Sequence, residues 1–197
     1  MTKKLPKFEY VPDPIKAGMM EESKGICDCC NENHYYICLG GIYSKHDDVI
    51  NLCPWCVFSG KASKKYDGHF NMVDIDKNSM EPVVDEQGKT TGFRTIEGYQ
   101  KPIGNDEIES RTPSIVGYQE QDWRHHCGEC CDFHGRAIGN DFKNLSQSSK
   151  EILQENSYID DESEIEELQD FGMQEIPYFI KFICRHCDTI LLIYDPN

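Results

Sequence analysis

The sequence predicts an α+β protein. We expect small zinc-ribbon-like lobes of short antiparallel strands and a few helices, stapled by two four-cysteine zinc sites. Two observations lead to this class: cysteines recur in pairs, and the apolar content is low. Of the 197 residues, 38% are hydrophobic, and that share includes 11 cysteines. Such a composition gives a thin core for a chain of this size, so bound metal would supply part of the stability.

The cysteine pairs have the spacing of metal-binding knuckles. In chain order the pairs are Cys27 with Cys30, Cys53 with Cys56, Cys127 with Cys130 or Cys131, and Cys184 with Cys187. A tight Cys-x-x-Cys turn directs two thiolates at one ion, and four such half-sites can form two tetrahedral Zn²⁺ centres. A closed site made only of cysteines leaves no position for substrate. The pattern therefore indicates a structural role before a catalytic one.

The first predicted site joins Cys27 and Cys30 to Cys53 and Cys56. Asn31 supports this choice, since asparagine tolerates the left-handed conformation that often follows a knuckle. The alternative is a redox dithiol in the Cys-Pro-Trp-Cys sequence. That chemistry needs a thioredoxin-type strand and helix around the pair, and the surrounding sequence does not have this pattern.

The second predicted site joins Cys184 and Cys187 to ligands from residues 125–131. Cys127 with Cys130 gives the common spacing, and Cys127 with Cys131 gives a looser one. A histidine could also ligate here, and the candidates are His125 and His126. The alternative is that Cys184 and Cys187 pack as small core side chains, as buried free cysteines often do.

The chain is strongly acidic, with 35 Asp and Glu against 20 Lys and Arg and a formal net charge of −15. This balance argues against direct nucleic-acid binding, which needs a Lys/Arg surface. No apolar run approaches the roughly 20 residues that cross a bilayer. The basic N-terminus lacks the apolar segment of a secretory signal. We therefore predict a cytoplasmic protein without membrane contact, and in a reducing compartment paired cysteines bind metal more often than they form disulfides.

The predicted organisation is an N-terminal zinc-knuckle lobe over 1–74, an insertion or linker over 75–110, and a C-terminal zinc-ribbon-like lobe over 111–197. The alternative is that the two lobes pack together as one domain. The elements expected within it are an extended arm over 5–18, strands around Gly40-Gly41, a helix over 57–70 with Ser59 as N-cap, a hairpin at 86–89, helices capped by Ser146 or Ser148 and near Asp160, and strands over 178–183 and 189–194.

Four blocks of sequence carry a family resemblance. They are LPKFEYVPDPIKAG (5–18), LCPWCVFSGKASKKYDGHF (52–70), RTPSIVGYQEQDWRHHC (111–127) and FICRHCDTILLIYD (182–195). In this order they resemble the CbrC family of small bacterial proteins, whose best-known member is associated with tolerance to the nuclease colicin E2. The family pattern H-C-x-x-x-C-x-F-x-G matches residues 126–135 and favours Cys131 over Cys130 as a ligand. The chain departs from the family in longer segments over 75–110 and 141–176.

The resemblance implies a cytosolic protein that blunts a toxic nuclease. Nuclease domains are usually basic because they bind nucleic acid, and an acidic protein can bind such a surface. The predicted function is therefore that of a non-catalytic, zinc-stabilised protein with a protein partner, possessing no catalytic residues. The predicted partner patch consists of Asp160, Asp161, Glu164 and Glu167, near Tyr158 and Phe171. The alternative for this patch is a solvated acidic helix face.

The sequence is also compatible with two other functions. A zinc-dependent hydrolase would need an ion held by three protein ligands and one water, or an acid–base site such as His69 beside Asp67 with Glu120 and Asp122. Tyr118 and Trp123 could line its pocket or brace the second zinc lobe. A nucleic-acid-associated zinc-ribbon protein is the second alternative.

Overall fold

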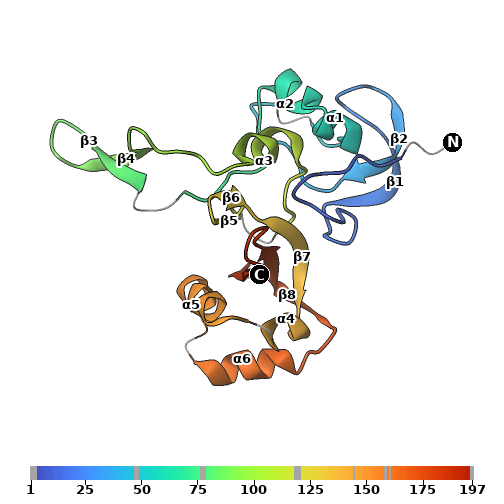
Figure 1. Ribbon diagram of the computed structural model, residues 1–197. Helices are drawn as coiled ribbons and strands as arrows, with labels where there is room; N and C mark the ends of the chain where they lie inside the picture. Colours follow the sequence, from blue (N-terminus) through green and yellow to red (C-terminus); the bar gives the residue numbers. More distant parts are fainter. Residues whose placement is uncertain are drawn as a thin grey trace.

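The computed structural model describes residues 4–46, 49–75, 79–117, 121–143, 145–157, 159 and 161–195. It confirms the α+β class: short antiparallel sheets alternate with short helices (Figure 1). The elements in chain order are β1 (Met20–Ile26), β2 (Asn33–Cys38), α1 (Pro54–Phe58), α2 (Lys61–Tyr66), β3 (Met80–Val84), β4 (Thr90–Thr95), α3 (Asn105–Arg111), β5 (His125–His126), β6 (Glu129–Cys130), β7 (Asp132–Ile138), α4 (Gly139–Lys143), α5 (Gln147–Asn156), α6 (Glu162–Gln169), β8 (Glu175–Ile183) and β9 (Ile190–Tyr194).

The N-terminal region pairs β1 with β2 and places α1 and α2 beside them (Figure 1). The single helix predicted over 57–70 is in fact two helices. Gly60 adopts a left-handed φ of 69° between them, a conformation that interrupts a helix and that glycine adopts without penalty. Ser59, predicted as an N-cap, is instead the C-cap of α1.

The predicted hairpin is present and projects from the body as β3 and β4 (Figure 1). The Asp85 carboxylate accepts from the backbone N–H groups of Gln87 and Lys89, which shapes the turn. The segment 75–110 is not all linker, because it ends in α3. Ile108 of that helix is fully buried, and the Arg111 Nε donates to the Phe58 carbonyl at 2.8 Å.

The C-terminal region contains the three-stranded antiparallel sheet β7-β8-β9, with β8 in the centre. Helices α4, α5 and α6 bury Phe142, Leu153 and Ile165 in one apolar cluster with side chains of this sheet. The helix caps agree with the sequence: the Ser146 Oγ accepts from the Ser149 N–H, and the Asp161 carboxylate accepts from the N–H groups at the start of α6.

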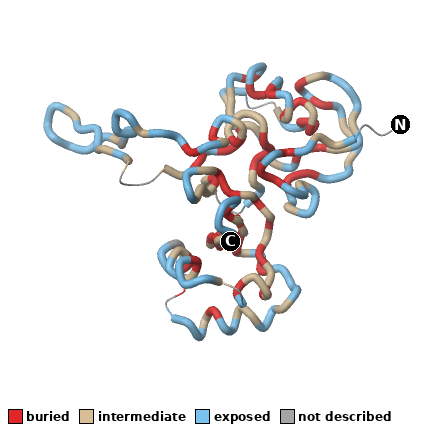
Figure 2. Tube along the Cα trace, in the orientation of Figure 1, coloured by how far each residue is buried: buried red, intermediate tan, exposed pale blue. Residues whose placement is uncertain are grey.

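The main apolar core includes residues from both ends of the chain, from Phe8 to Ile193 (Figure 2). Trp123 is fully buried at its centre, 5.6 Å from the ring of Phe133 and 5.6 Å from that of Phe182. Its Nε1 donates to the Cys131 carbonyl at 2.9 Å. Trp123 is therefore a bracing residue and not a pocket wall. Within the described ranges, no helix has the length and apolar content required to cross a membrane.

Gly135 is required where β7 approaches the N-terminal arm. Its φ is +83°, and a Cβ at this position would lie 2.7 Å from the Ala17 Cα. We expect Gly135→Ala to lower the free energy of unfolding by about 2 kcal/mol or more, from left-handed strain and the backbone clash together. Thermal or urea unfolding measures this. Gly92→Ala is the control, because Gly92 has no neighbour within 4 Å and an ordinary φ; equal losses in the two variants would contradict the argument.

Candidate metal centres

The first cluster brings together the four cysteines predicted for it. The sulfur atoms of Cys27, Cys30, Cys53 and Cys56 all lie within 4.8 Å of one another. Cys27 and Cys53 are fully buried, Cys56 is nearly so, and Cys30 is half-buried. Two turns distant in the sequence, one after β1 and one at the start of α1, therefore converge on a single point.

Backbone geometry shapes the first of these turns. Asn31 has a φ of 61°, the left-handed conformation expected after the knuckle, and its N–H donates to the Cys27 carbonyl at 2.7 Å. The Asp28 carboxylate accepts from the N–H groups of Ile50 and Asn51, at 2.9 and 2.7 Å. Asp28 thereby holds the chain that leads to the second knuckle close to the first.

Donors also surround the sulfur atoms and carbonyls of this cluster. The Cys53 N–H donates to the Cys27 Sγ at 3.3 Å, and His34 Nε2 lies 3.2 Å from the Cys30 Sγ. The Lys65 Nζ donates to the carbonyls of Asp28 and Cys29, at 2.8 and 3.0 Å. A four-thiolate site with Zn²⁺ carries a net charge of about −2, which such N–H groups and a nearby ammonium stabilise.

One thiol of the first cluster, that of Cys27, is polarised toward the thiolate form. A hydrogen bond from the Cys53 thiol lowers the pKa of Cys27 to about 4, and backbone N–H groups add to this effect against the opposing influence of burial. The same shared proton raises the pKa of Cys53. A metal ion would replace that proton, because zinc binds cysteine as the thiolate.

The second cluster contains one of the alternative ligands, His126, in place of the preferred Cys131. It contains His126, Cys127, Cys184 and Cys187, with all four donor atoms within 4.8 Å of one another. Cys184 is buried, His126 is half-buried, and Cys127 and Cys187 are exposed. The hydrogen bond with Thr189 lowers the pKa of Cys187 to about 6, and the hydrogen bond with Cys187 raises that of Cys127 to about 11.

The second cluster has the dimensions of a tetrahedral zinc site. With Zn–S near 2.3 Å and Zn–N near 2.0 Å, ligand sulfurs should be about 3.8 Å apart, and a sulfur and a nitrogen about 3.5 Å apart. The Sγ atoms of Cys127 and Cys187 are 3.8 Å apart. The His126 Nδ1 lies 3.2 Å from one of these sulfurs and 3.4 Å from the other. The donor set therefore fits Zn²⁺ in a closed four-coordinate site.

The family pattern favoured Cys131, and the geometry favours His126 in its place. Cys131 is fully buried in the apolar core; its N–H donates to the Arg124 carbonyl and its own carbonyl accepts from Trp123. These two bonds fix the backbone of Cys131 in the core, and its sulfur is not in the group of four. Burial raises the pKa of its thiol, and the charge of Cys184 adds to this effect.

The other alternative ligands also lie outside the group. Cys130 is fully buried, and its N–H donates to the Ile103 carbonyl at 2.9 Å, which ties β6 to the segment before α3. His125 is the neighbour of His126 on the short strand β5, where successive side chains point to opposite faces. The sequence named His126 as a candidate, but spacing alone could not rank it above the cysteines.

A polar network links the second cluster to the N-terminal arm. Glu129 accepts from the Tyr10 hydroxyl at 3.1 Å and from the Arg185 guanidinium at 2.7 Å, and its other oxygen lies 2.7 Å from the His186 Nε2. Burial acts to raise the pKa of Glu129, but these hydrogen bonds and the charge of Arg185 lower it overall. The network orients the second knuckle pair, since Arg185 and His186 lie between Cys184 and Cys187.

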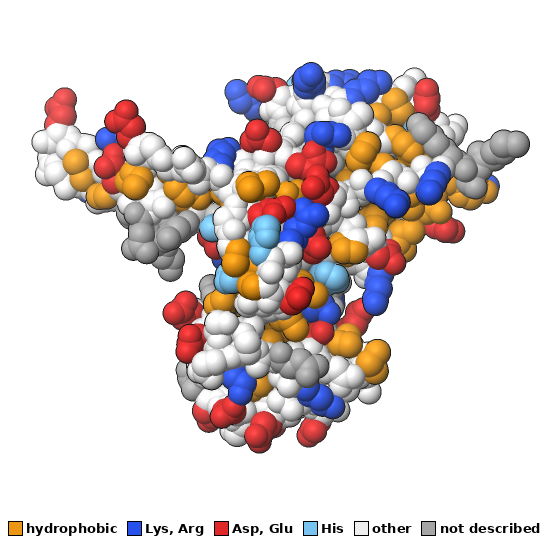
Figure 3. All heavy atoms as spheres, in the orientation of Figure 1, with side chains coloured by type: hydrophobic (Ala, Val, Ile, Leu, Met, Phe, Trp, Pro, Cys, Tyr) orange, Lys and Arg blue, Asp and Glu red, His pale blue; other side chains and the backbone are white. Residues whose placement is uncertain are grey.

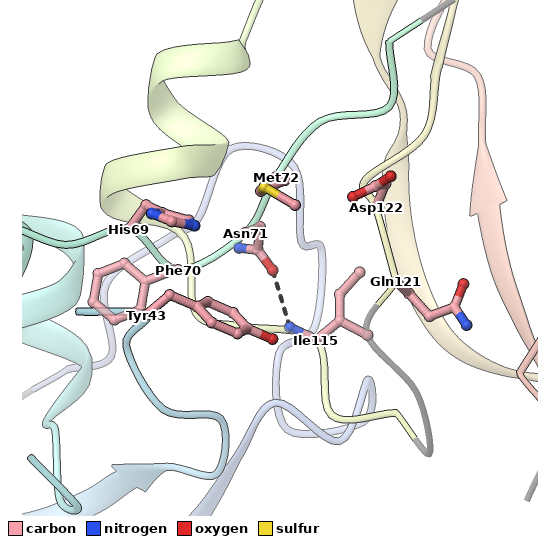
Figure 4. Close-up of a pocket in the computed structure, with 8 residues that line it drawn as sticks. All are labelled: Tyr43, His69, Phe70, Asn71, Met72, Ile115, Gln121 and Asp122. Atoms are coloured by element: carbon pink, nitrogen blue, oxygen red, sulfur yellow. Dashed lines mark hydrogen bonds between the residues drawn. The ribbon is translucent and has the colours of Figure 1, made fainter. Parts of the chain in front are cut away.

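The described members of the predicted acid–base group, His69, Asp67 and Asp122, do not converge. His69 and Asp122 line one small cavity of about 60 Å³, but they lie at its opposite ends, with Asn71 and Met72 between them (Figure 4). His69 stacks on Tyr43 at 5.4 Å, and Asp67 caps α2 outside this cavity. Glu120 and Tyr118 lie outside the described residues. The cavity is therefore poorly arranged for a carboxylate–histidine pair.

The predicted partner patch is partly described. Asp161 is exposed and caps α6, Glu164 is half-buried and Glu167 is exposed, while Asp160 and Tyr158 lie outside the part that the structure describes. Phe171 follows α6 and is 41% exposed. The acidic face of α6 is thus accessible beside an aromatic side chain.

These features define a class: a small α+β protein with two compact clusters of cysteine and histidine, each suited to a structural metal ion. Within that class, the chain belongs to the Uncharacterised protein family (UPF0167), whose model matches residues 5–196.

Individual relatives support the family assignment. The chain is 28% identical over 132 residues to a UPF0167 protein of Mycobacterium bovis, covering 67% of this chain and 60% of the relative. It is 30% identical over 138 residues to a UPF0167 protein of Pseudomonas aeruginosa, covering 70% of this chain and 66% of the relative. The chain thus spans less than two thirds of each of these relatives. No solved structure matches it significantly.

Proposed function

We propose that this chain is a non-catalytic binding protein whose two clusters each hold one structural Zn²⁺. The observation that carries the proposal is the convergence of four donor atoms at each of two points, with all donors within 4.8 Å. When bound, the metal supplies a cross-link between distant segments. Cys27, Cys30, Cys53 and Cys56 would hold the first ion, and His126, Cys127, Cys184 and Cys187 the second.

We further propose that the partner is a basic protein, and that the chain acts as CbrC-family proteins are expected to act, by protecting the cell against a nuclease toxin. The net charge of −15 supports a basic partner. Acidic side chains also lie over the hairpin and the helical region around α6 (Figure 3). Complementary charge accelerates encounter with a cationic surface. All eleven cysteines are free of disulfides, which suits a reducing compartment such as the cytoplasm.

The two alternative functions have less support. A zinc hydrolase needs an open coordination position, and both clusters already offer four protein donors. A nucleic-acid-associated role needs a cationic surface. Three lysines lie on α2, namely Lys61, Lys64 and Lys65. The Lys65 ammonium donates to the carbonyls of Asp28 and Cys29, which withdraws it from a phosphate-binding role.

Salt dependence tests the proposed partner. We expect the zinc-loaded chain to bind the inactivated nuclease domain of colicin E2, and the association rate constant to fall roughly tenfold or more between about 25 and 500 mM salt, because screening removes long-range attraction. Stopped-flow or surface-based kinetics measures this rate. An acidic protein of similar size is the control. No binding at low salt, or a rate that does not depend on salt, would contradict a charge-steered basic partner.

A further inference from the structure

A wide groove lies between α6 and the strands β8 and β9, away from both clusters. Its volume is about 540 Å³. The half-buried side chains of Tyr178 and Tyr194 form one wall, and the buried Phe179 packs against them. Their rings pack at centroid distances of 5.4 to 6.1 Å, mostly tilted or edge-on. Phe171 forms a further, exposed part of the lining.

Two carboxylates of α6 also line this groove, those of Glu164 and Glu167. Neither forms an ion pair with any Lys, Arg or His in the described part of the chain, whereas Glu162 on the same helix pairs with Lys150. The last turn of α6 contains no basic residue. The helix dipole places partial negative charge at this end of α6, where Glu167 lies.

Aromatic faces and unpaired carboxylates in one groove favour an organic cation. A cation over an aromatic ring is attracted by the ring's quadrupole, and a carboxylate beside it adds a charge-assisted hydrogen bond. A metal ion is a poorer match, because Glu164 and Glu167 are not among the described groups whose ligand atoms converge. Arginine suits both features best: its planar guanidinium stacks on a ring while it donates to a carboxylate.

We propose that this groove binds an arginine side chain presented by the basic protein partner. The inference rests on the proposed binding function and assigns the contact to one place. Charge on α6 would then govern the encounter, and insertion of arginine between Glu167 and Phe171 would slow dissociation. The acidic helix face is accordingly the rim of an anchor site and not only a solvated surface.

Titration of the zinc-loaded full chain with the capped peptide acetyl-Gly-Arg-Gly-amide tests the groove directly. We expect amide chemical-shift changes in nuclear magnetic resonance spectra to centre on α6, β8 and β9, and the matching lysine peptide to bind more weakly. Glu167→Gln should weaken the arginine peptide about fivefold, and Phe171→Ala two- to fivefold, from loss of an exposed charge pair and a cation–π contact respectively.

Matched controls exist on the same elements. Glu166→Gln removes a neighbouring exposed carboxylate of α6, and Met173→Ala removes an apolar side chain that is 76% exposed; neither residue lines the groove. Both controls should change the affinity less than twofold. Shift changes centred elsewhere, or equal losses in variants and controls, would overturn the inference.

The same variants separate this inference from the proposed function. If the nuclease domain binds but its dissociation rate is the same for Phe171→Ala and Glu167→Gln as for the unaltered chain, the groove is not the anchor and the partner-binding function stands. If the nuclease domain does not bind while the arginine peptide still contacts the groove, the proposed partner is wrong and the groove stands as a site for arginine.

Discussion

Cys53→Ser is expected to remove one of two zinc ions and to abolish the cooperative melt of the main core. The Cys53 sulfur is fully buried in the first cluster, within 4.8 Å of three other sulfurs. Its partners Cys27 and Cys30 come from the turn after β1, so the cluster joins that turn to the start of α1. Serine retains the shape but is a poor zinc ligand compared with a thiolate.

The loss of stability in Cys53→Ser is expected to be large because zinc binding contributes as much free energy as a whole domain has. A structural zinc contributes roughly 10–16 kcal/mol of apparent binding free energy at neutral pH, whereas a whole domain is stable by only about 5–15 kcal/mol. The cysteines of the first cluster also belong to the main apolar core together with Trp123 and Phe182. Release of the ion would therefore loosen the packing of both ends of the chain, and exhaustive chelation should have the same effect.

Cys29→Ser provides the matched control for the first cluster. Cys29 lies in the same turn and is 5% exposed, but it is not in the group of four. This variant should retain two zinc ions per chain and lose about 1 kcal/mol of stability. Elemental analysis for zinc and thermal unfolding followed by circular dichroism measure both quantities. A metal-free chain with an unchanged cooperative melt would overturn the structural role of the first cluster.

The first cluster could be predicted because its information is local. Each Cys-x-x-Cys turn carries its own geometry, and Asn31 adds the left-handed residue that the turn requires. The caps of α5 and α6 are local in the same sense, since Ser146 and Asp161 bind N–H groups two or three residues away. Such features depend little on the rest of the fold.

The parts that were missed depend on contacts between distant segments. The short helix α3 has one fully buried apolar residue, Ile108, too few for a helical period to show in the sequence. Strand β1 reads as the polar sequence MEESKGI and is fixed by its pairing with β2. The ranking of ligands in the second cluster is a similar case. His126 was a candidate, but the bonds of the Cys131 backbone with Trp123 and Arg124 join segments that no spacing rule relates.

The second cluster gives the other large expected effect. We expect His126→Ala to lose the second zinc ion, because the His126 Nδ1 lies 3.2 and 3.4 Å from the sulfurs of Cys127 and Cys187. Cys131→Ala should retain both ions and lose only about 1–3 kcal/mol, the cost of truncating a buried side chain. Zinc analysis and urea unfolding of the two variants distinguish these outcomes.

The comparison of these two variants also decides whether the fourth ligand is Cys131, which the family pattern favours, or His126, which the geometry favours. The two clusters together offer seven sulfurs and one nitrogen, and X-ray absorption at the zinc edge should detect that nitrogen and lose it in His126→Ala. If instead Cys131→Ala releases zinc while His126→Ala retains it, Cys131 must leave the core to ligate. The hydrogen bonds that its backbone makes with Arg124 and Trp123 would then have to rearrange when the metal binds.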